Sequence, residues 1–202
     1  TRLRTVTGVQ TCALPISMHE CLSDTIGGFN SFLESQKSIG GTMSLYLFND
    51  KLEEMYKDKN INDIENITKT DFVPCGGTAL YDAIGKVLTS HRLGENSTVI
   101  ILTDGHENSS KMYSRQVIRD LIQMNEAAGV RFLFLAAHES AFDGADDIGL
   151  NRRDALNYRA EIESPMAFET LATCLRNRSQ GVDTPLSNSN TQQKKSRRDT
   201  AP

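Results

Sequence analysis

Hydrophobic and polar positions along this chain form two kinds of segment, short continuous apolar runs and longer stretches with helical spacing. The runs TMSLYLFND, STVIILTDG and VRFLFLAA predict buried strands, and KLEEMYKD can pair back on the first of them as an edge hairpin. Helical spacing predicts helices over about 21–36, 114–129, 140–148 and 165–178, and VPCGGTALYDAIGKVLTSHR predicts a loop that leads into a further helix. Strands that alternate with helices predict a mostly parallel sheet with helices on both faces.

All the predicted helices except the short one at 140–148 have an apolar stripe that we expect to face inward. For the second, third and last helices these stripes are Leu80, Ile84, Val87 and Leu88; Val117, Ile118, Leu121 and Ile122; and Phe168, Leu171, Ala172 and Leu175. In the first helix, Gly27 and Gly28 predict a close approach to the sheet. Residues 58–71 are polar and predict connecting chain, whereas 158–162 predict a last strand.

The first sixteen residues, TRLRTVTGVQTCALPI, match the translation of a common short-read sequencing adapter. The match is residue for residue from Val6 to Ile16, and the preceding residues fit the bases that flank the adapter. We therefore expect residues 1–16 to be a non-native segment and the natural sequence to begin near Ser17 or Met18, so that the chain is an amino-terminal truncation. Residues 17–181 then form one domain, and 182–202, with almost nothing to bury, are expected to be a disordered polar tail.

The composition limits the kinds of binding partner and the cellular compartment that we expect. Acidic residues outnumber basic ones by eight within 17–181, which disfavours sequence-independent binding to nucleic acid. No apolar run approaches membrane-spanning length, so no membrane partner is expected. Outside the first sixteen residues, Cys21, Cys75 and Cys174 form no C-x-x-C pair, and this favours reduced thiols in a cytoplasmic protein.

Two segments carry candidate chemistry: CGGTALYDAI, a glycine-rich turn into a helix, and VIILTDG, a buried strand that ends in an acid. Thr78 lies where a helix cap is expected, and capping alone would explain it. Asp104 is less easily explained, because a carboxylate that emerges from a doubly buried strand needs a cation or hydrogen-bond donors. Both segments lead to the carboxyl ends of strands, where binding sites of parallel sheets form.

Together with the LYLFND strand and the late ALNY segment, these motifs resemble the von Willebrand factor type A domain of the bacterial and phage type, over nearly all of 17–181. The resemblance implies a three-layer, Rossmann-like α/β fold and a non-enzymatic protein-binding module. It also implies a metal-ion-dependent adhesion site, in which D-x-S-x-S after the first strand and a Thr and an Asp from later loops hold Mg²⁺ or Mn²⁺. By position, Thr78 is the loop threonine and Asp104 the loop aspartate. An Asp or Glu of a protein partner would complete the metal's shell of oxygens.

The chain departs from this pattern where D-x-S-x-S should stand, because it has Ala13, Leu14, Pro15, Ile16 and Ser17 there. Only Ser17 agrees. We therefore expect the intact parent to hold the metal and this chain to bind it poorly, with its native central strand missing. The segment 9–16 is expected to fill that central position, with hydrogen bonds missing near Pro15, whereas a fully paired strand there would count against a foreign origin.

Further residues are expected at the rim of the site, where they would contact the partner: His19, Glu20, Gly77, Gly105 and His106, with Glu107 beside them. Asp82, one turn into its helix, fits a favourable interaction with the helix dipole. One alternative is a Mg²⁺-dependent phosphoryl-transfer or nucleotide-hydrolysing enzyme on a similar sheet, although the chain has no G-x-x-x-x-G-K-[ST]. A scaffold domain that binds partners without metal is the other alternative.

Overall fold

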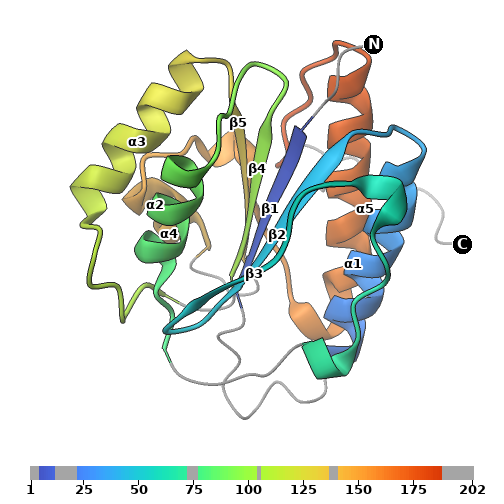
Figure 1. Ribbon diagram of the computed structural model, residues 1–202, viewed down its shortest axis with the longest axis horizontal. Helices are drawn as coiled ribbons and strands as arrows, with labels where there is room; N and C mark the ends of the chain where they lie inside the picture. Colours follow the sequence, from blue (N-terminus) through green and yellow to red (C-terminus); the bar gives the residue numbers. More distant parts are fainter. Residues whose placement is uncertain (1–4, 12–21, 72–76, 104–105, 137–140, 188–202) are drawn as a thin grey trace, which may run out of the picture.

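A single six-stranded sheet forms the centre of the protein in the computed structural model, which describes residues 5–11, 22–71, 77–103, 106–136 and 141–187 (Figure 1). The strands are β1 (Thr5–Thr11), β2 (Thr42–Phe48), β3 (Leu52–Asn60), β4 (Thr98–Thr103), β5 (Arg131–Ala136) and β6 (Ala155–Asn157). Their order in the sheet is β3-β2-β1-β4-β5-β6, and every pairing is parallel except that of β2 with β3, the predicted edge hairpin.

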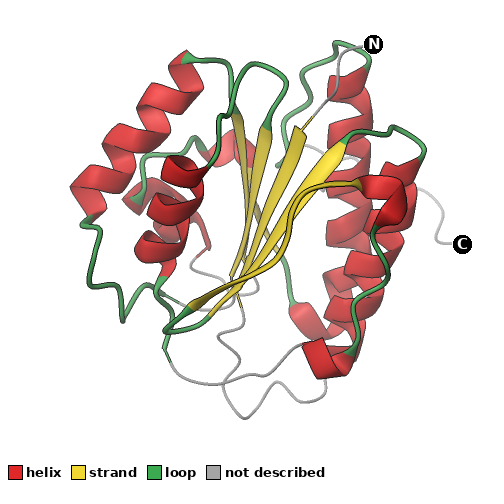
Figure 2. Cartoon of the chain, viewed as in Figure 1, coloured by secondary structure: helices red, strands yellow, loops and turns green. Residues whose placement is uncertain are grey.

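Helices cover both faces of the sheet, which confirms the three-layer α/β architecture (Figure 2). On one face lie α1 (Leu22–Lys37) and α5 (Ala160–Ser179); on the other lie α2 (Leu80–Ser90), α3 (Arg115–Ala127) and α4 (Ala141–Asp147). Because β2, β4 and β5 are covered on both sides, almost all their side chains are buried, and the apolar core divides into one cluster on each face.

Residues 5–11 fill the central position of the sheet, where the native strand was expected to be missing. β1 pairs with β2 along its whole length and with β4 from Val6 to Gln10. This strand begins four residues before the expected segment 9–16, and Pro15 lies outside the described residues. The continuous pairing counts against a foreign origin. Ladder hydrogen bonds come from the backbone and make little demand on side-chain identity, so the origin of residues 1–16 stays a prediction.

The segment between β3 and α2 is connecting chain, as expected, although β3 extends to Asn60 and part of the segment is packed into the core. Ile61, Ile64 and Ile67 are almost completely buried against the α1 side of the core. The side-chain amide of Asn30 in α1 holds the backbone of Ile67 by two hydrogen bonds of 3.0 Å, one in each direction. Two 3-10 turns, at Ile61–Asp63 and Lys69–Asp71, carry the chain along this path.

The glycine pair in α1 accommodates another helix, and the expected approach to the sheet is wrong. A Cβ atom on Gly28 would lie 2.4 Å from the ring of Phe168 in α5, whereas one on Gly27 would meet nothing within 4 Å. Phe168 also packs against Phe29 and Phe32 at ring-centroid distances of 6.3 Å. Gly28 therefore permits the close α1–α5 contact that covers this face.

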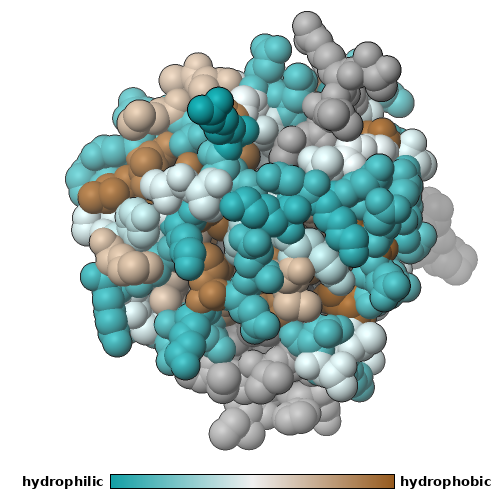
Figure 3. All heavy atoms as spheres, viewed as in Figure 1, coloured by the Kyte–Doolittle hydropathy of each residue, from teal (hydrophilic) through white to brown (hydrophobic). Residues whose placement is uncertain are grey.

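The predicted stripe of α3 is only half right. Ile118 and Ile122 are buried, but Val117 is 43% exposed and Leu121 is half-buried at the margin of the core. With Met112 and Met124, Val117 makes up most of the large apolar side chains that stay exposed among the described residues. Hydrophobic colour accordingly interrupts the polar surface on the side where α3 lies (Figure 3). Ser114 caps α3 as predicted, since its hydroxyl accepts a hydrogen bond from Val117 N.

The end of the chain also differs from expectation. α5 begins at Ala160, so the predicted strand 158–162 is wrong, and the last strand is β6 at 155–157. Residues 182–187 were expected to be disordered but pack on the domain, where Leu186 is fully buried. We call 182–187 the C-terminal strap; residues 188–202 lie outside the described part.

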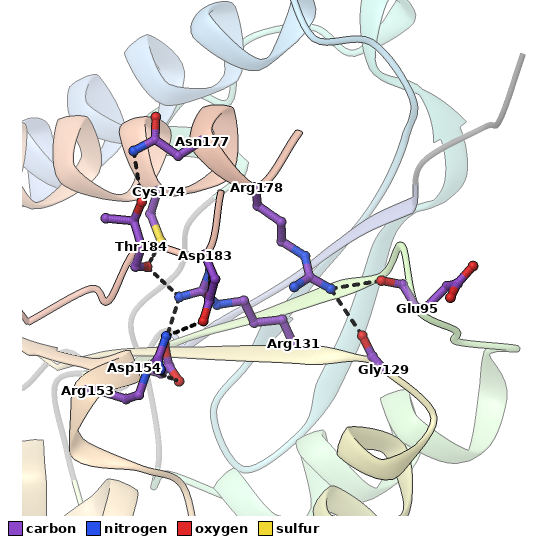
Figure 4. Close-up of polar contacts among 10 residues, drawn as sticks. All are labelled: Glu95, Gly129, Arg131, Arg153, Asp154, Cys174, Asn177, Arg178, Asp183 and Thr184. Carbon is purple, nitrogen blue, oxygen red and sulfur yellow. Dashed lines mark hydrogen bonds and ion pairs between the residues drawn. The ribbon is translucent and has the colours of Figure 1, made fainter. Parts of the chain in front are cut away.

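Charged groups hold the strap to the domain (Figure 4). Arg131, at the start of β5, is 7% exposed and donates to Asp154 Oδ1 at 2.8 Å and to the carbonyl of Thr184 at 2.6 Å. Its Nη1 lies 3.0 Å from Asp183 Oδ1, as an ion pair without hydrogen-bond alignment. From α5, the Cys174 thiol donates to the same carbonyl of Thr184 at 3.0 Å. The strap therefore connects α5 to the edge of the sheet.

Candidate functional site

The loops with the candidate chemistry meet at one edge of the sheet. Strands β1, β2, β4 and β5 run parallel, so the segments that follow them emerge at the same edge, which is the lower one in Figure 1. The turn 49–51 follows β2, and β4 ends at Thr103, directly before Asp104. The turn contacts the threonine loop, because Ala79 N donates to Asn49 O at 2.7 Å.

Thr78 is buried at this edge, with 2% of its surface exposed, and its backbone is paired with Asn108. Thr78 N donates to Asn108 Oδ1 at 2.8 Å, and Asn108 N donates to Thr78 O at 3.1 Å. Within the described part of the chain, no hydrogen bond involves the Thr78 hydroxyl. The backbone of Thr78 is thus fixed by Asn108, whereas its side-chain oxygen has no hydrogen-bond partner among the described residues.

The interpretation of Thr78 as a helix cap is wrong. The N-cap residue of α2 is Ala79, and no side-chain hydrogen bond comes from it. Capping comes instead from the loop after β4: Glu107 Oε2 accepts from Tyr81 N at 2.9 Å, and Ser110 Oγ accepts from Asp82 N at 3.1 Å. Both are amides of the first helical turn that have no partner within the helix.

Glu107 was expected near the ligand rim, but its carboxylate is turned to the protein. Besides Tyr81 N, it accepts from Ser109 N at 2.9 Å, from Ser110 N at 2.7 Å and from Ser110 Oγ at 2.6 Å. The carboxylate of Asp82 in turn accepts from the amides of Lys111, Met112 and Tyr113 at 2.8–2.9 Å. Asp82 therefore does more than favour the helix dipole, because it fixes the loop over the start of α2.

Gly77 lies in close contact with the same loop. A Cβ atom there would lie 2.4 Å from Ser109 Oγ and 2.6 Å from Asn108 Oδ1, so a larger residue requires the loop to move. The acidic surroundings also act on Tyr81, whose pKa is raised by burial and then by the charges of Asp147 and Glu107. Segments 77–82 and 107–113 thus form one unit, which we call the loop brace.

Of the predicted site residues, the structure describes Thr78, Gly77 and His106, and His106 is exposed. Ser17, His19, Glu20, Asp104 and Gly105 lie outside the described residues. Sequence reasoning missed Asn49, Asn108 and Ser110. The polar run HENSS directly after an apolar strand was a signal for the last two, because polar residues at that edge need partners.

Within the described ranges, no three His, Cys, Asp or Glu side chains group closely enough to hold a metal ion. The same ranges contain no helix with the length and apolar character that crossing a bilayer requires.

Solved structures resemble this fold across most of the chain. Proximal thread matrix protein 1 from the mussel byssus, with a zinc-occupied MIDAS (metal-ion-dependent adhesion site) motif, matches with a TM-score of 0.60 and 12% identity, covering 86% of this chain and 48% of that one. A von Willebrand factor type A structure from Catenulispora acidiphila matches with 0.58 and 11%, covering 86% and 42%. Manganese-loaded TRAP from Plasmodium vivax matches with 0.56 and 14%, covering 81% and 71%.

No protein-family model and no curated protein matches the sequence. The chain spans less than half the length of the mussel protein. At such low sequence identity the similarity concerns the fold, and two of these three structures hold a divalent cation, zinc or manganese. With its sheet order, its two helical layers and these structural relatives, the chain has the fold of a von Willebrand factor type A domain.

Proposed function

We propose that this domain is a non-enzymatic protein-interaction module, which binds an acidic group of a protein partner through a divalent cation, Mg²⁺ or Mn²⁺. The observation that carries the proposal is the hydroxyl of Thr78. It belongs to a buried residue whose backbone is bound to Asn108 in the loop after β4, and no hydrogen bond among the described residues involves it. A polar group that the surrounding residues do not pair is available to a ligand.

The chemistry of the proposed ligands supports a hard cation. Mg²⁺ takes hydroxyl and carboxylate oxygens and keeps some of its waters. Thr78 would supply a hydroxyl oxygen and Asp104 a carboxylate, with Ser17 as a further ligand. The cation would supply a positive charge for the partner's Asp or Glu, while Gly77, Gly105, His106, His19 and Glu20 would form the rim.

In this proposal the chain with its present sequence binds metal weakly, because two of the three D-x-S-x-S ligands are absent. Ala13 and Pro15 stand where the pattern has Asp and Ser, so the double variant Ala13→Asp/Pro15→Ser restores it within the full chain. We expect this variant to bind Mn²⁺ at least tenfold more tightly than the unmodified chain, as measured by electron paramagnetic resonance titration.

Two further substitutions in the restored chain test the ligands. Asp104→Ala and Thr78→Val should each abolish or strongly weaken Mn²⁺ binding, because each removes one oxygen. Thr89→Val, which removes a hydroxyl at the far end of α2, should leave it unchanged. Equal affinity in the restored and unmodified chains, or in Asp104→Ala, would refute the proposal. Nucleotide turnover by the restored chain would favour the enzyme alternative, and metal-independent capture of a partner the scaffold alternative.

A further inference from the structure

Within the part of the chain that the structure describes, the loop brace leaves the Thr78 hydroxyl without the hydrogen bond that a threonine before a helix ordinarily makes. A Thr just before a helix is a preferred cap, since its oxygen can accept from an unpaired amide of the first turn. Here those amides already have acceptors from another loop: Glu107 takes Tyr81 N and Ser110 takes Asp82 N. Glu107 and Ser110 therefore cap α2, and Thr78 does not have to use its hydroxyl for this purpose.

The backbone of Thr78 is fixed by the same loop. Asn108 accepts from Thr78 N through its side chain and donates to Thr78 O through its own backbone, so both backbone polar groups of Thr78 are bound by one residue. Two hydrogen bonds on one residue leave its Cα–Cβ direction little freedom. Glu107 fixes the residues that follow Thr78 and Asn108 in the two loops, because its carboxylate accepts four hydrogen bonds from Tyr81, Ser109 and Ser110.

We propose that Asn108 and Glu107 are positioning residues of the metal site: they take over the backbone groups around Thr78 and so keep its hydroxyl free and oriented for a cation. This inference rests on the proposed function. Neither residue touches the metal in this scheme, and both act through Thr78. Residues that orient metal ligands in this indirect way typically change metal affinity 10–100-fold when they are substituted.

A readout without metal tests the brace in the unmodified full chain. Scalar couplings measured by nuclear magnetic resonance report the χ1 angle of Thr78, and amide exchange reports the protection of its N–H. We expect one χ1 rotamer and a protected amide in the parent, and rotamer averaging with faster exchange in Asn108→Ala. Asn108→Asp keeps the oxygen that accepts from Thr78 N and should restore both signals. An unchanged rotamer and unchanged exchange in Asn108→Ala would overturn the inference.

Metal affinity is then measured in the restored chain, Ala13→Asp/Pro15→Ser. Asn108→Ala and Glu107→Ala should each weaken Mn²⁺ binding about tenfold, with rescue by Asn108→Asp. The matched control is Ser114→Ala, which removes the cap of α3 and lowers stability without touching Thr78. Equal loss of affinity in this control would overturn the positioning role. If the restored chain binds no Mn²⁺ at all, the proposed function fails, and the rotamer measurement still decides whether the brace holds Thr78.

Discussion

At the scale of single residues, Tyr46 shows how burial and a carboxylate act on one proton. Its side chain lies in β2 with 2% of its surface exposed. The phenol donates to Glu54 Oε2 at 3.0 Å and lies 2.6 Å from Nε2 of His91, just after α2. Burial and then the hydrogen bond to Glu54 raise the pKa of Tyr46 from 10.0 to about 12, because both disfavour the phenolate.

This shift predicts a loss of stability at high pH. The folded state keeps the Tyr46 proton more tightly than the unfolded chain does, so its contribution is complete below pH 10 and is lost as the pH rises from 10 through 12. We expect Tyr46→Phe to be less stable than the parent at pH 9, with the difference shrinking by pH 11.5. Urea denaturation at the two pH values measures it. A difference that stays constant across this range would contradict the prediction.

At the scale of elements, the sequence predicts what depends on local pattern and misses what depends on neighbours. The strands β2, β4 and β5 and the helix α3 lie where their apolar runs and caps predict. Segment 61–67 escaped prediction because three isoleucines at a spacing of three fit neither helix nor strand, and their burial comes from α1. Likewise, no pattern in CGGTALYDAI indicates that Glu107, from another loop, would cap α2 in place of Thr78.

The contact between α1 and α5 predicts opposite changes in stability when the two adjacent glycines of α1 are replaced by alanine. Gly27→Ala should stabilise the protein by about 1 kcal/mol, because alanine favours the helix and its Cβ meets nothing. Gly28→Ala places the same methyl group against the buried ring of Phe168, and overpacking of this kind costs about 1–3 kcal/mol. Thermal unfolding midpoints should therefore move in opposite directions. Equal shifts in the two variants would show that α1 and α5 do not approach as described.

At the scale of the whole molecule, the domain extends to the strap, and truncation tests this limit. Removal of 188–202 should change stability little, because that sequence has almost nothing to bury. Removal of 182–202 also removes the buried Leu186, which exposes the core residues around it, and it leaves Arg131 without Asp183. Burial of one leucine contributes about 1.5–3 kcal/mol, so the free energy of unfolding should fall by at least about 2 kcal/mol in urea. Equal stability of the two truncations would mean that the strap is not part of the fold.

The last prediction concerns β1, the strand in the centre of the sheet, and the origin of its sequence. A strand buried on both faces of a parallel sheet is ordinarily a continuous apolar run, as in the TVIILT of β4. The sequence of β1, TVTGVQT, has only two apolar side chains of valine size, which is fewer than such a strand ordinarily has, and a segment of foreign origin would account for this composition. We therefore expect the natural reading frame upstream of Met18 to encode a more apolar strand that ends in D-x-S-x-S. Sequencing the source locus checks this directly, and a natural gene that keeps VTGVQTCALPI would contradict it. If the natural segment is found, its substitution for residues 1–17 should raise the unfolding midpoint and confer Mn²⁺ binding together, because the same stretch of chain would supply the central strand and most of the metal ligands.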